Sequence, residues 1–179
     1  CIDRVRYGIT IGKCYWSRFC NVRFYNYEIG LDIANANSTS ITGCTFRGGF
    51  DRGLIFRRSS NEASAGQGVT LAGCDFSGNN YCGLQILGSF SSSSITGNYF
   101  EAEPGYQFVV GGKDSESITP ISVTSCNIMG NSGLWVKTNG KDCIRVYGEF
   151  SSNYCNASVR FMDGSSGSKN IGINEVTTG

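Results

Sequence analysis

Acidic side chains are the residues of this sequence best suited to catalysis, because its 179 residues include no histidine. Without imidazole, neither a Ser-His-Asp or Cys-His centre nor an HExxH zinc site can be built from these residues alone. Hydrolysis would have to use carboxylates, Lys, Tyr or Cys, and a pair of carboxylates suffices to cleave a glycosidic bond. The acids of interest are therefore those that the fold would bring close together.

A repeated pattern determines which acids those are. Its first part recurs as I-T-G-C-T-F at 41–46, L-A-G-C-D-F at 71–76, I-T-G-N-Y-F at 95–100 and V-T-S-C-N-I at 123–128. Its second part is a glycine followed by an apolar–x–apolar run, with glycines at 8, 30, 53, 83, 105 and 133. The mean step between these glycines is about 25 residues, and the alternation is typical of β-strands, not helices.

This period predicts an all-β, single-stranded solenoid with three short strands per turn, about 25 residues per turn and about seven turns. Identical positions would stack about 4.8 Å apart, and each large apolar side chain would contribute about 1.5–3 kcal/mol on burial. Phe46, Phe76, Phe100 and Ile128 should form one inward column. A second inward column should contain Ile9, Leu31, Leu54, Leu84, Tyr106, Leu134 and Val159.

The nine cysteines indicate a reducing compartment. Their number is odd and no CxxC pair occurs, so free cysteines acting as small apolar groups are favoured over a disulfide framework. We expect Cys44, Cys74 and Cys126 to be reduced and to stack at one bend toward Asn98. This expectation favours assembly in a reducing cytosol.

The unit Ile-x-x-(Asn/Cys)-x-Phe followed by Gly-(Leu/Ile)-x-Ile resembles one turn of the right-handed parallel β-helices of the pectate-lyase-like superfamily, over residues 8–176. The signatures of the polygalacturonase branch (Asn-Thr-Asp, Asp-Asp, Gly-His-Gly and Arg-Ile-Lys) are missing. Within the superfamily the sequence is most similar to bacteriophage tailspikes and receptor-binding proteins. This resemblance implies a homotrimer, and it implies that acids on the outside of a strand can be catalytic.

Two outward ladders supply the candidate site. The positions two residues before the repeat glycines form one ladder, and the outward positions of the following strands form the other. The predicted catalytic residues are Glu28, Asp51 and Asp32, and the predicted binding residues are Arg52, Trp135 and Tyr81. Two carboxylates on adjacent turns would raise one pKa toward the range of a general acid.

Each of these assignments has a structural alternative. The acids would then form a solvated edge with an Asp–Arg pair, and the Arg52 region would be an ordinary charged surface. An outward Trp135 could stack on a sugar or contact a neighbouring subunit. Glu101 and Glu103 form a reserve pair of acids.

The leading functional hypothesis is a segment of a bacteriophage tailspike or tail fibre that recognises, and could depolymerise, a bacterial surface polysaccharide. Residues 1–179 should form one β-helix domain of a longer chain with flanking domains, since uncapped ends would expose strand edges. We expect assembly as a homotrimer in the bacterial cytoplasm and a place in the virion. The alternatives are a secreted polysaccharide lyase or glycosidase, and a non-catalytic structural or adhesion β-helix.

Several other classes of function are disfavoured. The net charge of +1 gives no electrostatic reason to expect nucleic acid or an anionic membrane as a partner. No apolar run exceeds three residues, so membrane insertion is not expected. The sequence contains no phosphate-binding loop, EF-hand loop or zinc-ligand spacing, so we expect no cofactor and no metal.

Overall fold

A computed structural model of the chain describes residues 2–3, 5–60, 64–101, 104–111, 121–129, 131, 136–139 and 143–151. Side chains are described for 5–60, 64–101, 104–111 and 131. The elements in this part are all β-strands, and none of it forms a helix that could span a membrane.

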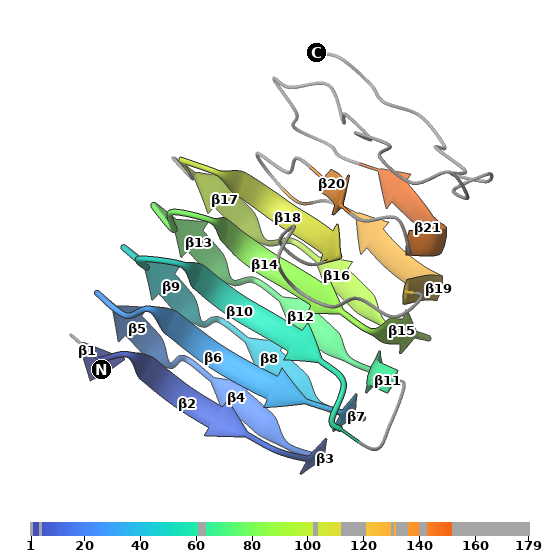
Figure 1. Cartoon of the computed structure of the whole chain (residues 1–179), viewed down its shortest axis with the longest axis horizontal. Helices are drawn as coiled ribbons and strands as arrows, with labels where there is room; N and C mark the ends of the chain where they lie inside the picture. Colours follow the sequence, from blue (N-terminus) through green and yellow to red (C-terminus); the bar gives the residue numbers. More distant parts are fainter. Residues whose placement is uncertain are drawn as a thin grey trace.

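The strands form three parallel sheets, which we call A, B and C (Figure 1). Sheet A contains β1 (Ile2–Asp3), β5 (Arg23–Tyr25), β9 (Thr45–Arg47), β13 (Asp75–Ser77) and β17 (Tyr99–Glu101). Sheet B contains β2 (Tyr7–Ile11), β6 (Ile29–Ala34), β10 (Arg52–Arg57), β14 (Cys82–Leu87), β18 (Tyr106–Gly111) and β20 (Val136–Asn139).

Sheet C consists of two rows of short strands joined by a longer one. The first row is β3 (Cys14–Tyr15), β7 (Ala36–Asn37), β11 (Ser64–Gln67) and β15 (Ser89–Ser91). The second row is β4 (Arg18–Cys20), β8 (Ser40–Thr42), β12 (Thr70–Ala72) and β16 (Ser94–Thr96). The joining strand β19 (Ile121–Met129) pairs with β15, β16 and β21 (Cys143–Ser151).

The chain visits the sheets in a fixed order. It runs from sheet B through both rows of sheet C to sheet A, and then returns to sheet B one strand further along. Each pass is one coil, and Figure 1 shows successive coils stacked from blue to yellow. The predicted all-β solenoid is confirmed as a parallel β-helix.

Aromatic rings stack along the inside of sheet A. Phe24, Phe46, Phe76 and Phe100 are separated by 22, 30 and 24 residues and occupy one register position. Their successive ring centroids lie 4.9, 4.9 and 4.8 Å apart, with the rings within 9° of parallel. The predicted column is therefore confirmed for its phenylalanines, and a continuous apolar stack holds the coils in register. Ile128 does not belong to it, because it pairs with Ile95 in sheet C.

The bends depend on residues with left-handed backbone conformation. Between sheets C and A this residue is Asn21, Gly43, Gly73 or Gly97, with φ between 56° and 62°. Asparagine and glycine tolerate this conformation better than other residues do. The N–H groups of Asn21, Gly43 and Gly73 each donate to a carbonyl of the following coil, which ties neighbouring bends together.

The repeat glycine has a different role at the start of the sheet B strands. A Cβ on Gly30 would lie 2.6 Å from the carbonyl oxygen of Gly53 and 3.1 Å from the ring of Tyr27. Only glycine fits here without displacing the backbone. The glycine in each repeat therefore reflects close packing against the aromatic core.

One part of the predicted register was wrong in sheet B. Ile9, Leu31, Leu54 and Leu84 share a column as predicted, but this column continues with Phe108 and not with Tyr106. Tyr106 lies opposite Cys82. The reason is that Gln107, not Gly105, occupies the position of the repeat glycine in this coil. Leu134 and Val159 lie outside the described residues.

A second correction concerns the segment at 123–128. Val123 pairs with Phe90 and Ile128 with Ile95, so the predicted match of Val123 to Ile95 is five residues out of register. Cys126 consequently lies opposite Gly148 and does not join the column of Asn98. The residue next to Asn98 on the following coil is Asn131.

Candidate functional site

The candidate site lies at the A–B corner, which comprises residues 26–28, 48–51 and 78–81 between the strands of sheets A and B. Asn26, Gly48 and Gly78 have positive φ there and turn the chain. The residues that follow are held by paired backbone hydrogen bonds. The N–H groups of Asp51 and Arg52 both donate to the carbonyl of Glu28, at 3.1 and 3.0 Å.

The same arrangement continues along the corner. The N–H groups of Tyr81 and Cys82 donate to the carbonyl of Asp51, and the N–H of Glu28 donates to the carbonyl of Arg6. Arg6, Glu28, Asp51 and Tyr81 therefore form a ladder on successive coils. The predicted stacking of Glu28, Asp51 and Tyr81 is confirmed. On the next coil, the N–H of Tyr106 donates to the carbonyl of Tyr81. Glu103 lies outside the described residues.

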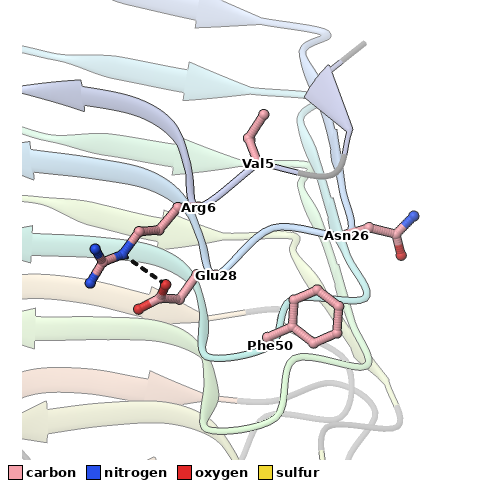
Figure 2. Close-up of a pocket in the computed structure, with 5 residues that line it drawn as sticks. All are labelled: Val5, Arg6, Asn26, Glu28 and Phe50. Atoms are coloured by element: carbon pink, nitrogen blue, oxygen red, sulfur yellow. Dashed lines mark hydrogen bonds and ion pairs between the residues drawn. The ribbon is translucent and has the colours of Figure 1, made fainter.

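A hollow of about 560 Å³ opens beside the first three coils of this ladder (Figure 2). It is lined by Val5, Arg6, Asn26, Glu28 and Phe50. The Nε of Arg6 donates to Oε2 of Glu28 at 3.0 Å, and both side chains reach solvent, with exposed fractions of 72% and 41%. Phe50 is 67% exposed, although it is a large apolar side chain.

Arg6 is held on two sides in this hollow. Its guanidinium forms the ion pair with Glu28 and lies 5.4 Å from the centre of the Tyr7 ring. A planar cation restrained in this way is positioned to offer its remaining N–H groups as hydrogen-bond donors. The hollow thus combines an aromatic face, a carboxylate, an amide and a guanidinium.

Arg52 and Tyr81, two predicted binding residues, are instead packed within the corner. Nη1 of Arg52 lies 3.1 Å from Oδ2 of Asp51, and the Arg52 side chain is 8% exposed. The guanidinium lies 5.3 Å from the centre of the Tyr81 ring, which in turn packs edge-on against Tyr106. In the structure these residues therefore stabilise the corner, and a role in ligand binding stays a prediction.

Asp32 lies away from the other two predicted acids. Asp32 lies in β6, four residues after Glu28, so the Cα atoms of the two residues are about 13 Å apart in extended chain. Its carboxylate pairs with Nε of Arg57 at 2.6 Å and is 10% exposed. The structure thus brings Glu28 and Asp51 to neighbouring coils, separates Asp32 from them, and gives each of the three acids its own arginine.

Trp135, the remaining predicted binding residue, lies outside the described residues. The outward column that was predicted to contain it runs through Thr10, Asp32, Ile55, Gln85, Val109 and Lys137. Val109 and Lys137 occupy the two places predicted for Gln107 and Trp135, because the strands β18 and β20 are each shifted by two residues relative to the prediction.

A second group of charged residues, which was not predicted as a site, lies on the outer face of sheet A. Asp75 is opposite Tyr99 on the next coil, and Arg47 and Glu101 are its diagonal neighbours. Burial raises the pKa of the Asp75 carboxyl, the positive charge of Arg47 lowers it in part, and the negative charge of Glu101 raises it further. Glu101 also accepts a hydrogen bond from Tyr99, whose pKa is raised by desolvation and by that carboxylate.

This second group has the features of a paired-carboxylate site. Asp75 and Glu101 are one strand apart and two residues out of step, which separates their Cα atoms by about 8 Å. Oδ1 of Asp75 is buried and has no hydrogen-bond partner among the described residues. Among the residues whose side chains the structure describes, no three His, Cys, Asp or Glu side chains are grouped so that they could hold a metal ion.

The comparisons agree with the architecture. The family model described as right handed beta helix region matches residues 29–178. The chain belongs to the right-handed β-helix family. Comparison with curated proteins and with solved structures gave no match. A right-handed β-helix is compatible with polysaccharide binding, polysaccharide degradation or a structural role, so the distinction among them depends on the two groups of residues described above.

Proposed function

We propose that this β-helix binds a bacterial surface polysaccharide through the hollow at the A–B corner. The observation that carries the proposal is the exposed ring of Phe50 in the same hollow as the Arg6–Glu28 ion pair. An aromatic face packs against the apolar C–H face of a sugar. Carboxylate, amide and guanidinium groups beside it supply acceptors and donors for sugar hydroxyls.

The scaffold supports this use because it is rigid where the hollow lies. Backbone hydrogen bonds join Arg6, Glu28 and Asp51 across successive coils, and the stacked phenylalanines lie directly inside. Side chains held on regular elements need little reordering when a ligand binds. The volume of the hollow is within the range of small-ligand sites, roughly 300–1,000 Å³.

On this proposal the chain is a segment of a bacteriophage tailspike or tail fibre with flanking domains. It is a homotrimer that assembles in the bacterial cytoplasm and is carried in the virion. The cysteines described with side chains are free thiols, which supports folding in a reducing compartment: Cys14, Cys20, Cys44, Cys74 and Cys82. A secreted enzyme is the alternative, and a measured mass of a monomer together with an export signal upstream would favour it.

Calorimetric titration with capsule or O-antigen oligosaccharides tests the binding site. Phe50→Ala should weaken binding at least tenfold, since the sugar loses its stacking surface. Trp16→Ala is the matched control, because Trp16 is 82% exposed at a different bend, and it should change affinity less than twofold. Absence of binding by the wild type, or equal losses in both variants, would refute the proposal.

Hydrolysis at Asp75 and Glu101 is the second candidate function, and the raised pKa of Asp75 beside another carboxylate favours it. A protonated Asp75 could donate its proton to the leaving glycosidic oxygen, while Glu101 acts as base or nucleophile. Glycosidase carboxyl groups lie roughly 5 to 10 Å apart, and flexible side chains on Cα atoms about 8 Å apart can reach that range.

Release of reducing ends from the polysaccharide tests this candidate. If the sheet A pair is catalytic, Asp75→Asn and Glu101→Gln should each reduce kcat at least a hundredfold. Glu28→Gln, in the binding hollow, should then raise KM and leave kcat unchanged, and Asp51→Asn and Asp32→Asn should leave kcat unchanged. The opposite pattern would support the acids predicted from the sequence. Binding without any product, whether reducing ends or unsaturated sugars, would identify the protein as a recognition module.

A further inference from the structure

Two cysteines occupy equivalent positions at the bend between sheets C and A. Cys44 and Cys74 each follow the left-handed glycine of that bend, Gly43 and Gly73. The N–H of Asp75 donates to the carbonyl of Cys44 at 2.9 Å, so the two cysteines lie directly over each other on adjacent coils. Adjacent strands are about 4.8 Å apart, which is within the Cα separation of disulfides, about 4.4–6.8 Å.

The side chains of this pair also meet. Both residues are buried, with exposed fractions of 1% and 2%, and Sγ of Cys74 lies 3.7 Å from the carbonyl oxygen of Ile41, in the coil that holds Cys44. Each thiol in addition lies near carbonyl oxygens of its own bend, at 3.6 Å from Thr42 for Cys44 and 3.5 Å from Ala72 for Cys74. The Cys74 side chain therefore reaches toward the coil of Cys44, directly beneath it in the stack.

The other described free cysteines lack such a neighbour. Cys14 lies opposite Ala36, Cys20 opposite Thr42, and Cys82 opposite Arg52 and Tyr106. Of the cysteines whose side chains the structure describes, Cys44 and Cys74 are thus the one pair at equivalent positions on adjacent coils.

We propose that Cys44 and Cys74 are a modification site, a dithiol that an oxidant converts into a disulfide between two coils of the folded protein. A small azo compound such as diamide can serve as the oxidant, and its reaction accounts for every bond, proton and electron. The Cys44 thiolate adds to one nitrogen of the N=N bond, and the other nitrogen takes a proton. The Cys74 sulfur then displaces the resulting hydrazide from Cys44 sulfur. Two thiols lose two electrons and two protons, and the azo compound becomes a hydrazine.

The ionisation of the pair suits this order of events. The interaction with Cys74 lowers the pKa of Cys44 to about 7, while the interaction with Cys44 and burial raise the pKa of Cys74. Near neutral pH, Cys44 is therefore the better nucleophile and Cys74 the resolving thiol. Under reducing conditions both stay thiols, in agreement with their free state in the structure.

The modification would fasten one coil to the next. The disulfide would close a loop of about 30 residues, so it should shift the unfolding equilibrium on the order of a hundredfold toward the folded state. A protein that folds in a reducing compartment and works outside it would gain this stabilisation only after export or release.

The test is oxidation of the purified, folded protein with diamide in a Cys20→Ser background, which removes an exposed thiol that could link molecules. Free thiols are then alkylated, and the non-reduced digest is analysed by mass spectrometry. A peptide linking Cys44 to Cys74 should appear in most molecules, should disappear in Cys44→Ser and Cys74→Ser, and should persist in Cys14→Ser, the buried control.

Two outcomes would overturn the proposal. In the first, the folded protein gives no Cys44–Cys74 peptide and both residues are alkylated after unfolding. In the second, the linked peptide forms only when oxidation is carried out in urea. Because both outcomes are read from the parent protein, they do not depend on whether the serine variants fold.

Discussion

The side-chain amide of Asn98 donates a hydrogen bond of 2.9 Å to the side-chain oxygen of Asn131 on the next coil. Both residues are 1% exposed. Asn98 also donates to the carbonyl of Leu71 and accepts from the N–H of Cys74, at 3.1 and 3.0 Å, while Asn131 donates to the carbonyl of Ile95. This two-residue ladder satisfies backbone groups that a sharp bend would otherwise bury unpaired.

Replacement of Asn98 by leucine should therefore destabilise the protein by about 3 kcal/mol, because the N–H of Cys74 and the carbonyl of Leu71 would lose their partners. Urea unfolding followed by circular dichroism measures the change. Thr96→Ala, on the outward side of the neighbouring strand, should cost less than about 0.5 kcal/mol. Equal losses for the two variants would contradict a structural role of the ladder.

Replacement of Phe76 by aspartate should abolish folding. Phe76 is fully buried between Phe46 and Phe100, so the variant would place an unpaired charge inside the aromatic stack. The matched control is Phe50→Asp, since Phe50 is 67% exposed and the same change there should leave the circular dichroism spectrum unaltered. A folded Phe76→Asp protein would show that the stack does not hold the coils together.

The stability contributed by Asp75 should depend on pH in a defined direction. Its pKa is raised in the folded state, so the folded protein prefers the protonated carboxyl, and stability falls as the pH rises through the raised value. Asp75→Asn should consequently be more stable than the wild type at pH 7 and equal to it near pH 3. Denaturation curves at both pH values measure the free energy of unfolding. If Asp75→Asn gained the same stability at both, the gain would not come from the ionisation of Asp75.

The fold could be predicted because the repeat determines it, but the register could be predicted only where the repeat is regular. The segment Ile128-Met-Gly-Asn131 matches Ile95-Thr-Gly-Asn98 more closely than V-T-S-C at 123–126 does. The predicted match at Val123 follows the spacing of the apolar residues and disregards the asparagine whose side chain satisfies the bend. The polar residue was the better guide, because a buried bend constrains hydrogen-bonding groups more strongly than it constrains an apolar side chain.

The candidate sites were predictable only in part, because they depend on properties that a sequence pattern does not carry. The ladder of Glu28, Asp51 and Tyr81 follows from the spacing of the repeat. The exposure of Phe50 does not, since neighbouring coils decide which bend residues are covered. The diagonal placement of Asp75 and Glu101 follows from the predicted column of Phe76 and Phe100, whereas the partial burial of Asp75 comes from packing.

Replacement of Arg6 by alanine should separate binding from stability in the hollow. The Arg6–Glu28 pair is exposed, so its loss should cost no more than about 0.5 kcal/mol of folding free energy. Oligosaccharide affinity should nevertheless fall about tenfold, because the variant loses donors that the ion pair and the Tyr7 ring hold in place.

The contrasting variant is Arg57→Ala. It leaves the carboxylate of Asp32, 10% exposed, without the arginine that pairs with it at 2.6 Å, so it should destabilise the fold by about 2 kcal/mol. Its affinity for oligosaccharide should stay unchanged, since neither residue lines the hollow. If both arginine variants changed stability and affinity in parallel, the loss of binding in Arg6→Ala would be a consequence of unfolding, and the hollow would no longer be supported as the sugar site.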